Sequence, residues 1–401
     1  MILELIVALI VGILCGVITG LLPGIHINLV SVILLSFSFF LSHFSPLVLV
    51  VFIVSMSICH TFIDFIPSIF LGAPDEDSVL SVLPGHEMLN KGRAYEAVIL
   101  TLYGSVSAII LLFFLTPIFI YTLPYLYPRI QPIIPFILIL SSCFLFFSEK
   151  QKKLWAIIIF LLAGFLGIAV FNLNLKEPLL PMLTGLFGSS SLITSILKKQ
   201  KIPKQKISKF RNIKIKKSSI FRSLFASLIA SPLCSFLPAL GSGQAAVLGS
   251  EVTGDLDRKE FLILLGSINT IVMGLSFVTL YAIQKARTGA AVAVGELIPE
   301  LTTSNLIVII ATIFFAGIFA FFLTIFLAKI FSKNISKFSY NKLSLVILVF
   351  LSTVVLFFSG ILGFLVFVVS TFLGLTCIYL SIKRINLMGC LLLPTILIYL
   401  L

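Results

Sequence analysis

Charged side chains are scarce in this chain: they make up 11% of its 401 residues, whereas 59% of the residues are hydrophobic. A soluble globular domain is nearer to half apolar and about a quarter charged. The mean hydropathy is correspondingly high, at +1.21. Water cannot cover so much apolar surface, so we predict an integral membrane protein whose outer surface lies in lipid.

The usual signatures of enzymes and cofactor sites are also missing. The sequence has no Walker loop, no His-Glu-x-x-His motif and no Ser-His-Asp order. Asp75, Glu76 and Asp77 lie close together but lack regular metal-ligand spacing. We therefore predict no cofactor, no metal site and no catalytic residue. The sequence also lacks a nucleotide-binding domain, so we do not expect the chain to use ATP unaided.

The six cysteines do not form a redox or zinc motif. All of them lie in apolar stretches, and none belongs to a Cys-x-x-Cys pair. Isolated cysteines in such surroundings usually pack as small hydrophobic side chains. A disulfide framework is therefore not expected.

Apolar stretches long enough to cross a bilayer, about 20 residues each, recur along the whole chain. They predict an all-α, polytopic membrane fold with roughly 10–14 transmembrane or re-entrant helices. The expected spans are 2–22, 46–71, 97–123, 131–148, 154–171, 179–197, 219–237, 261–283, 305–330, 343–359, 361–381 and 386–401. Segments 28–44 and 242–254 are expected to be short or re-entrant.

The net charge of +13 is concentrated near the middle of the chain. Its main basic residues are Lys198, Lys199, Lys201, Lys204, Lys206, Lys209, Arg211, Lys214, Lys216, Lys217 and Arg222. Such a run can bind nucleic acid. Between apolar spans it is more typical of a cytoplasmic loop that obeys the positive-inside rule. We therefore expect a multi-pass protein of the cell membrane, in contact with the bilayer and with no nucleic-acid partner.

The basic run divides the chain into a first membrane repeat at 1–198, a cytoplasmic linker at 199–218 and a second repeat at 219–401. The stretch Gly20–His26 in the first half corresponds to Ser235–Gly241 in the second. In both halves the next apolar span ends in a polar segment with glycine and proline, and a long apolar span follows. This shared order of features indicates an internal repeat.

Charge also predicts the orientation of the repeats. Loop 124–130 follows the long span of the first half and lies one span from the basic loop at 150–153, so it should face outside. The corresponding loop of the second half, 331–342, carries three lysines and should face inside. Equivalent loops on opposite sides indicate inverted repeats. In many secondary transporters such repeats enclose the site near the membrane midplane.

Each half contains one break in an apolar stretch. In the first, Pro23 and Gly24 are followed by His26 and Asn28. In the second, the break contains Pro238, Gly241, Ser242, Gly243 and Gln244. If helix N-termini begin at these breaks, their free N–H groups face an anion, so we predict a substrate site there. The alternative is a pair of proline kinks whose glycines permit close helix packing.

Three further polar residues lie in or beside apolar spans. Asp64 and Asn269 are costly in hydrocarbon unless they are paired or functional, and we predict that they contact a coupling ion. Arg287 is a candidate for holding a substrate carboxylate through a bidentate pair. It equally fits an interfacial cation that reaches toward lipid headgroups.

These features resemble those of a known family, the large membrane subunit of tripartite tricarboxylate transporters. The resemblance rests on the Gly20–Gly24 break, the Gly72-Ala73-Pro74 turn, the segment Leu83–Ala97 and the break from Pro238 to Gly241. The second break has Ala239 where a glycine would complete a second Pro-Gly pair, and the chain is shorter than bacterial members of the family. Its His86-Glu87 pair and its Pro238–Gly241 segment resemble those of an archaeal branch. The resemblance implies a small membrane subunit and an extracytoplasmic binding protein as partners.

We therefore expect a secondary transporter that moves a small anion, a carboxylate according to the resemblance, together with H⁺ or Na⁺. Two alternatives stay open. A carrier of a lipid-linked phosphate would also use helix N-termini, because these bind phosphate as readily as carboxylate. An integral-membrane enzyme acting on lipid would instead use His86, Glu87 and nearby carboxylates.

Overall fold

The structure is a computed structural model. It describes residues 2–22, 43–72, 78–147, 149, 152–175, 177–197, 202–208, 213, 215–237, 242–254, 256–337 and 339–400. Over these residues the regular secondary structure is helical, without a strand, which confirms the predicted all-α fold. Eight helices within this part of the chain are long and apolar enough to cross a membrane.

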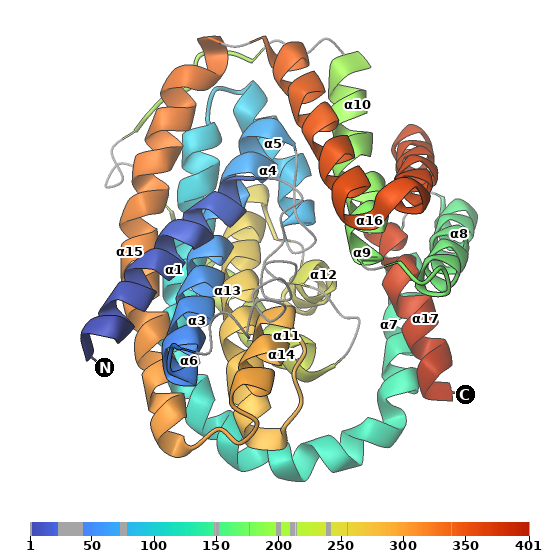
Figure 1. Cartoon of the computed structure of the whole chain (residues 1–401). Coiled ribbons are helices and arrows are strands. Elements are labelled where there is room, and N and C mark those ends of the chain that lie inside the picture. The colour runs from blue at the N-terminus through green and yellow to red at the C-terminus, as the bar shows by residue number, and fades with distance from the viewer. Residues whose placement is uncertain are drawn as a thin grey trace.

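The helices form two bundles side by side (Figure 1). The first bundle contains α1 (Ile2–Leu21), α3 (Pro46–Ile63), α4 (Phe65–Leu71), η1 (Val79–Ser81), α5 (Val82–Asn90), α6 (Ala94–Ile130), α11 (Lys217–Phe236), α12 (Ser242–Val252), α13 (Arg258–Ile283), α14 (Gly289–Leu297) and α15 (Thr303–Asn334). The second contains α7 (Ile134–Phe147), α8 (Lys153–Phe171), α9 (Leu179–Leu183), the π-helical η3 (Thr184–Ser189), α10 (Ser190–Leu197), α16 (Tyr340–Tyr379), η6 (Arg384–Met388) and α17 (Gly389–Leu400). Each half of the sequence thus contributes helices to both bundles.

Helix α6 connects the bundles. It extends beyond the predicted span at 97–123 and passes through Pro117, Pro124 and Pro128. A proline inside a helix removes one backbone hydrogen bond and bends the helix without necessarily ending it. The bent helix runs along the lower edge of the molecule and reaches α7 through η2 (Gln131–Ile133) (Figure 1). Tyr121 and Tyr125 are exposed on this stretch, as is typical of a helix at the membrane–water interface.

The predicted spans 343–359 and 361–381 form one kinked helix, α16. The kink lies at Gly360, whose φ of 65° and ψ of −166° are not helical. This backbone region is open almost exclusively to glycine, so the chain bends here without a separate loop.

The directions and neighbours of the helices repeat between the sequence halves. Helix α6 leads into α7 at the bottom of Figure 1, whereas α15 leads into α16 at the top, so the two run in opposite directions. Helix α1 packs on α3 as α11 packs on α13. Likewise, α15 packs on α3 as α6 packs on α13. This exchange of equivalent neighbours is the pattern of inverted repeats, although the repeat boundaries stay a prediction.

The centre of the first bundle is formed by α3 and α13, which are buried along most of their length. Helices α6 and α13 cross closely because each has a glycine at the contact. A Cβ atom on Gly104 would overlap the carbonyl oxygen of Ile263, and one on Gly266 would overlap that of Thr101. The hydroxyl of Ser105 donates to the Gly266 carbonyl at 3.1 Å. Small residues and polar bonds of this kind hold helices together in lipid.

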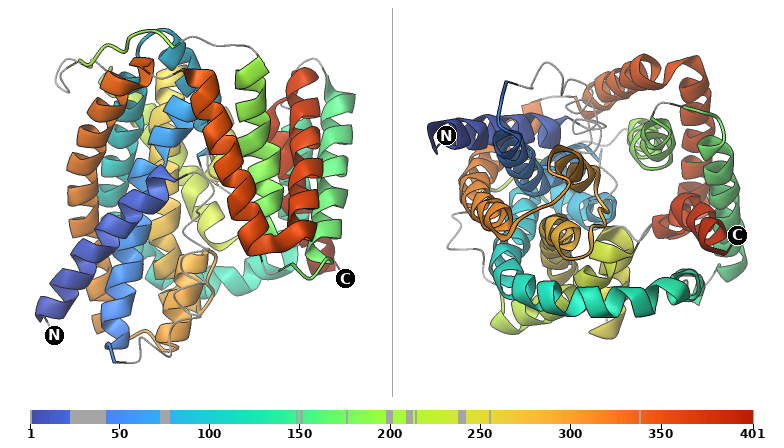
Figure 2. Two further views of the ribbon diagram at one scale, coloured as in Figure 1. Left: turned by 45° about the horizontal axis from the view of Figure 1, so that its top comes forward. Right: turned by 60° about the horizontal axis from the view of Figure 1, so that its bottom comes forward.

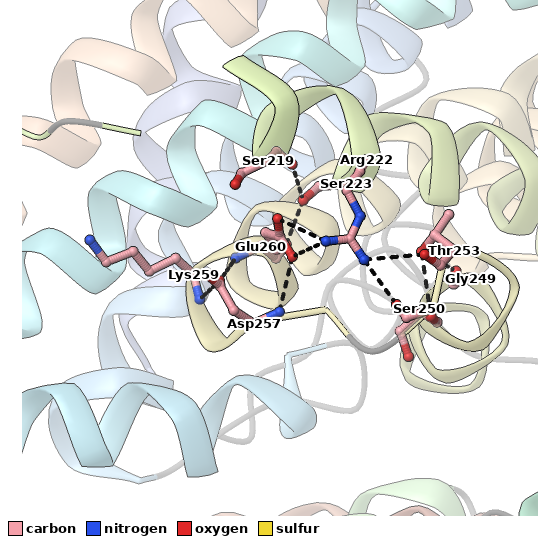
Figure 3. A network of polar contacts seen from close by, with 10 residues as sticks. Ser219, Arg222, Ser223, Gly249, Ser250, Thr253, Asp257, Lys259 and Glu260 are labelled. Atoms are coloured by element: carbon pink, nitrogen blue, oxygen red, sulfur yellow. Dashed lines mark hydrogen bonds and ion pairs between the residues drawn. The ribbon is translucent and has the colours of Figure 1, made fainter. Parts of the chain in front are cut away.

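The N-terminus of α13 is joined to several neighbours by charge. Asp257 caps the helix and forms a capping box with Glu260, which also pairs with Arg222 of α11 at 3.3 Å (Figure 3). Lys259 pairs with Glu96 of α6 at 3.0 Å, and Arg258 pairs with Glu87 of α5 at 2.5 Å. This end of α13 thus fixes α5, α6 and α11 relative to one another.

Part of the basic linker is docked on the same end of the first bundle. The Gln205 side chain accepts from the Ala94 N–H at 3.0 Å and donates to the Leu89 carbonyl at 3.0 Å. It therefore satisfies backbone groups at the end of α5 and the start of α6. The linker and the connection from α15 to α16 lie at the same end of the molecule (Figure 1).

We predict that Gly266→Ala destabilises the protein, because its methyl group has no room beside the Thr101 backbone. Overpacking of this kind costs about 1–3 kcal/mol. The measurement is the thermal unfolding temperature in detergent, which should fall clearly. Gly188→Ala is the matched control, because a Cβ there meets nothing nearer than 3.7 Å. Equal unfolding temperatures for the two variants would contradict the close crossing.

Candidate functional site

Asp64 and Asn269 meet in the centre of the first bundle. The Asn269 Nδ2 atom donates to Asp64 Oδ2 at 2.9 Å, and each residue is only 2% exposed. Asp64 separates α3 from α4, and its carbonyl accepts from the Ser68 hydroxyl at 2.9 Å. The two residues predicted to contact a coupling ion are therefore neighbours, one from each half of the sequence. Whether they bind an ion stays a prediction.

Equivalent positions of α3 and α13 meet beside this pair. The hydroxyls of Thr61 and Thr270 are 3.2 Å apart. Each threonine follows a polar residue, His60 in α3 and Asn269 in α13. A ring nitrogen of His60 lies 3.1 Å from the Thr19 hydroxyl of α1. The centre of the bundle is therefore polar on both sides of the contact between α3 and α13.

The C-terminal end of α1 lies close to Asp64. Gly20 lies against α3, where a Cβ atom would be 2.9 Å from Ile63 Cβ and 3.3 Å from the Asp64 nitrogen. Pro23, Gly24, His26 and Asn28 lie outside the described residues. Their predicted role at the site is therefore untested.

The described part of the second break lies between the bundles. Ser242 is buried and begins α12, which is in the middle of the molecule (Figure 1). A Cβ atom on Gly243 would lie 3.5 Å from Leu80 of η1 and 3.5 Å from Ile385 of η6. Pro238, Gly241 and the side chain of Gln244 lie outside the part of the chain that the structure describes. The start of α12 therefore contacts both η1, which belongs to the polar segment of the first half, and η6 of the second bundle.

Sequence reasoning missed a residue at this junction, Arg384 of η6. Its guanidinium donates to the Leu186 carbonyl and the Ser190 hydroxyl, each at 3.1 Å, and lies 5.3 Å from the centre of the Phe187 ring. Lys383 and Arg384 follow an apolar span, a position typical of cations at the membrane interface. The one sequence signal for an inward-facing site here was Asn386, a further polar residue two positions after Arg384 and just before the last apolar span.

His86 of α5 is electrostatically coupled to Arg384. Burial lowers the pKa of His86 from 6.5 to about 4, and the positive charge of Arg384 adds to this shift. His86 is therefore neutral at pH 7. The adjacent Glu87 is paired with Arg258, so it serves to hold α5 on α13. Within the described residues, no group of three or more His, Cys, Asp and Glu side chains is placed to hold a metal.

Arg287 lies in the partly exposed turn between α13 and α14. The following Thr288 caps α14 by accepting from the Ala291 N–H at 3.2 Å, and its hydroxyl is 2.9 Å from that of Ser276. Helix α14 lies at the bottom of Figure 1, whereas α12 is in the middle. The predicted contact between Arg287 and a substrate stays untested.

The two bundles, seen from further directions in Figure 2, with their eight apolar helices, define a multi-pass membrane protein. The chain belongs to the tripartite tricarboxylate transporter TctA family, whose family model matches residues 6–389. This confirms the resemblance inferred from the sequence. The chain is therefore a component of a tricarboxylate transporter, which points to a protein that is not an enzyme.

A relative from Methanocaldococcus jannaschii, an uncharacterised protein, is 33% identical over 391 residues. The alignment covers 94% of each chain. No solved structure matches the chain.

We predict that acid destabilises the protein partly through His86. Since the pKa of His86 falls from 6.5 to about 4 on folding, the unfolded chain binds more protons between these pH values. Stability should thus decrease as the pH falls through this window, and His86→Gln should reduce the decrease. The measurement is unfolding temperature against pH, with His43→Gln, at an exposed turn, as the control. Identical profiles for wild type and His86→Gln would contradict the assignment.

Proposed function

We propose that this chain is the permease of a secondary transporter that moves a small carboxylate across the cell membrane, driven by an H⁺ or Na⁺ gradient. The observation that carries the proposal is the buried contact between Asp64 and Asn269. It places a carboxylate inside a membrane bundle, at the contact between equivalent helices of the two halves. An intramembrane carboxylate is costly and marks ion and proton pathways in transporters.

In the proposed mechanism, Asp64 takes up the coupling ion. Its carboxylate accepts a proton or contributes a ligand to Na⁺, while Asn269 and the hydroxyls of Thr61 and Thr270 supply polar neighbours. Gly20 lies against the backbone nitrogen of Asp64, so a shift of this backbone on ion binding would be passed on to the end of α1. This contact is a physical link between ion binding and the predicted substrate site.

The carboxylate substrate is proposed to bind between the bundles, where α12 begins. The first N–H groups of a helix have no partner within the helix, and the helix dipole favours an anion there. The neighbouring η1 and η6 come from the two different bundles. Rocking of one bundle against the other would therefore open this position to each side in turn.

The predicted partners remain part of this proposal. Membership of a tripartite family favours a small membrane subunit and an extracytoplasmic binding protein that delivers the substrate. The cell membrane is the proposed location, with the basic linker facing the cytoplasm.

The test is uptake of labelled citrate, succinate or acetate into proteoliposomes with an imposed Na⁺ or pH gradient. We expect at least one of these carboxylates to accumulate only when a gradient is present. If none is taken up in response to either gradient, with or without co-purified partner subunits, the proposal is wrong.

Asp64→Asn should uncouple transport from the gradient, because an amide neither takes up a proton at neutral pH nor neutralises Na⁺. Gradient-driven accumulation should fall by at least about tenfold, while exchange of internal for external substrate continues. Glu177→Gln, in the loop before α9, is the matched control and should transport as wild type does. Full gradient-driven accumulation by Asp64→Asn would show that Asp64 does not couple the ion.

A further inference from the structure

Arg384 is held by an unusual set of partners. Its guanidinium donates to the carbonyl oxygens of Leu186 and Phe187 and to the hydroxyls of Ser190 and Ser191. Residues 184–189 form the π-helical segment η3. A π-helical turn shifts the backbone hydrogen bonds and is frequently found at functional sites. The four acceptors that fix the guanidinium are neutral, so none of them carries a charge that would balance it.

Among the described residues, no carboxylate forms an ion pair with Arg384. Ion pairs among them engage Arg93, Arg222, Arg258 and Lys259. Glu149 lies near the same turn, but its Oε2 accepts the backbone N–H of Lys383 at 3.1 Å and forms no ion pair with Arg384. A partly buried cation without a counter-charge is costly in a protein interior. It is therefore suited to attract an anion.

Two buried polar atoms of η6 also lack partners among the described residues. One is the Nε atom of Arg384, a donor, and the other is the Oδ1 atom of Asn386, an acceptor. Asn386 is fully buried, whereas the Arg384 side chain is partly exposed. Buried polar groups in native proteins nearly always have a partner, so unpaired ones indicate a missing ligand or water. Arg384 thus retains both charge and a donor for a ligand.

Arg384 is also placed where the proposed substrate would bind. The next residue, Ile385, lies 3.5 Å from the position of a Cβ on Gly243, at the start of α12. His86 of α5, in the first bundle, is also close enough to be affected by the charge of Arg384. The start of α12 and Arg384 therefore lie at the same junction between the bundles.

We infer that Arg384 is the residue of the second bundle that binds a carboxylate group of the transported anion. The inference rests on the proposed function and assigns one substrate-binding residue to it. An anion with two or more carboxylates can contact α12 with one group and Arg384 with another. A monocarboxylate can satisfy only one of these positions. The two positions together would thus select an anion with several carboxylates, the substrate class in the family's name, over a monocarboxylate, and its binding would draw the bundles together.

A purely structural role for Arg384 predicts different behaviour. In that case the guanidinium only fastens η6 to η3, and its loss lowers stability and the amount of active protein equally for every substrate. The two roles are separated by the selectivity of binding rather than by activity alone. Ser191→Ala provides the matched control, since it removes one acceptor of the guanidinium and retains the charge.

The experiment titrates citrate, succinate and acetate against the unfolding temperature of the purified protein and takes the concentration of each that gives half of the maximal increase. It also measures the KM of each anion that is transported. Arg384→Gln should weaken citrate and succinate binding by at least about tenfold, the effect of one charge-assisted bond, with acetate changed far less. Arg384→Lys keeps the charge and should be intermediate. Ser191→Ala should lower stability while leaving the selectivity of wild type.

Several results would overturn the inference. One is that Arg384→Gln retains the selectivity of wild type. Another is that Arg384→Gln and Ser191→Ala both lose affinity equally for all three anions. If Arg384→Gln does not fold, wild-type selectivity in Arg384→Lys together with an unchanged KM overturns it as well. If the wild-type protein transports carboxylates and any of these results is obtained, only the role of Arg384 is refuted. If the wild type shows neither uptake nor carboxylate-dependent stabilisation, the proposed function is refuted as well.

Discussion

The architecture depends on keeping a carboxylate, Asp64, inside a membrane bundle. Lipid cannot solvate such a group, so it must lie in protein and beside a polar partner, which Asn269 provides at 2.9 Å. That requirement explains why α3 and α13 are the most enclosed helices, with α1, α6, α11 and α15 packed around them. It also explains the glycine contact between α6 and α13, because close packing of these helices keeps lipid away from the pair.

The second organising feature is the division into bundles that meet where α12 begins. In the first bundle, ion pairs at the N-terminus of α13 and the docked linker fix α5, which carries His86. In the second, the π-helical segment fixes Arg384 on the opposite side. Each bundle is thus internally tied, while α6 and the connection between α15 and α16 join them (Figure 1). Such an arrangement suits rigid movement of one bundle against the other, as in the proposed mechanism.

Much of the fold was predictable from composition and spacing, because lipid requires long apolar helices. Asp64 and Asn269 were each predictable as expensive residues in apolar spans, but their hydrogen bond depends on how α3 and α13 pack. Helix α6 is longer than the predicted span 97–123, because its prolines bend the helix without ending it. Arg384 escaped notice because a cation beside an apolar span usually faces lipid headgroups, and its inward position depends on η3, whose π-helical form has no clear sequence signature.

The central claim is that the anion lies between the bundles, at the start of α12 and facing Arg384. The most direct measurement is a structure of the full chain in a membrane mimetic with bound citrate. The account predicts ligand density that contacts the first turn of α12 at Ser242 and Gly243 and reaches Arg384 across the junction. Density confined to one bundle, near Arg287 or on the lipid-facing surface, would contradict it.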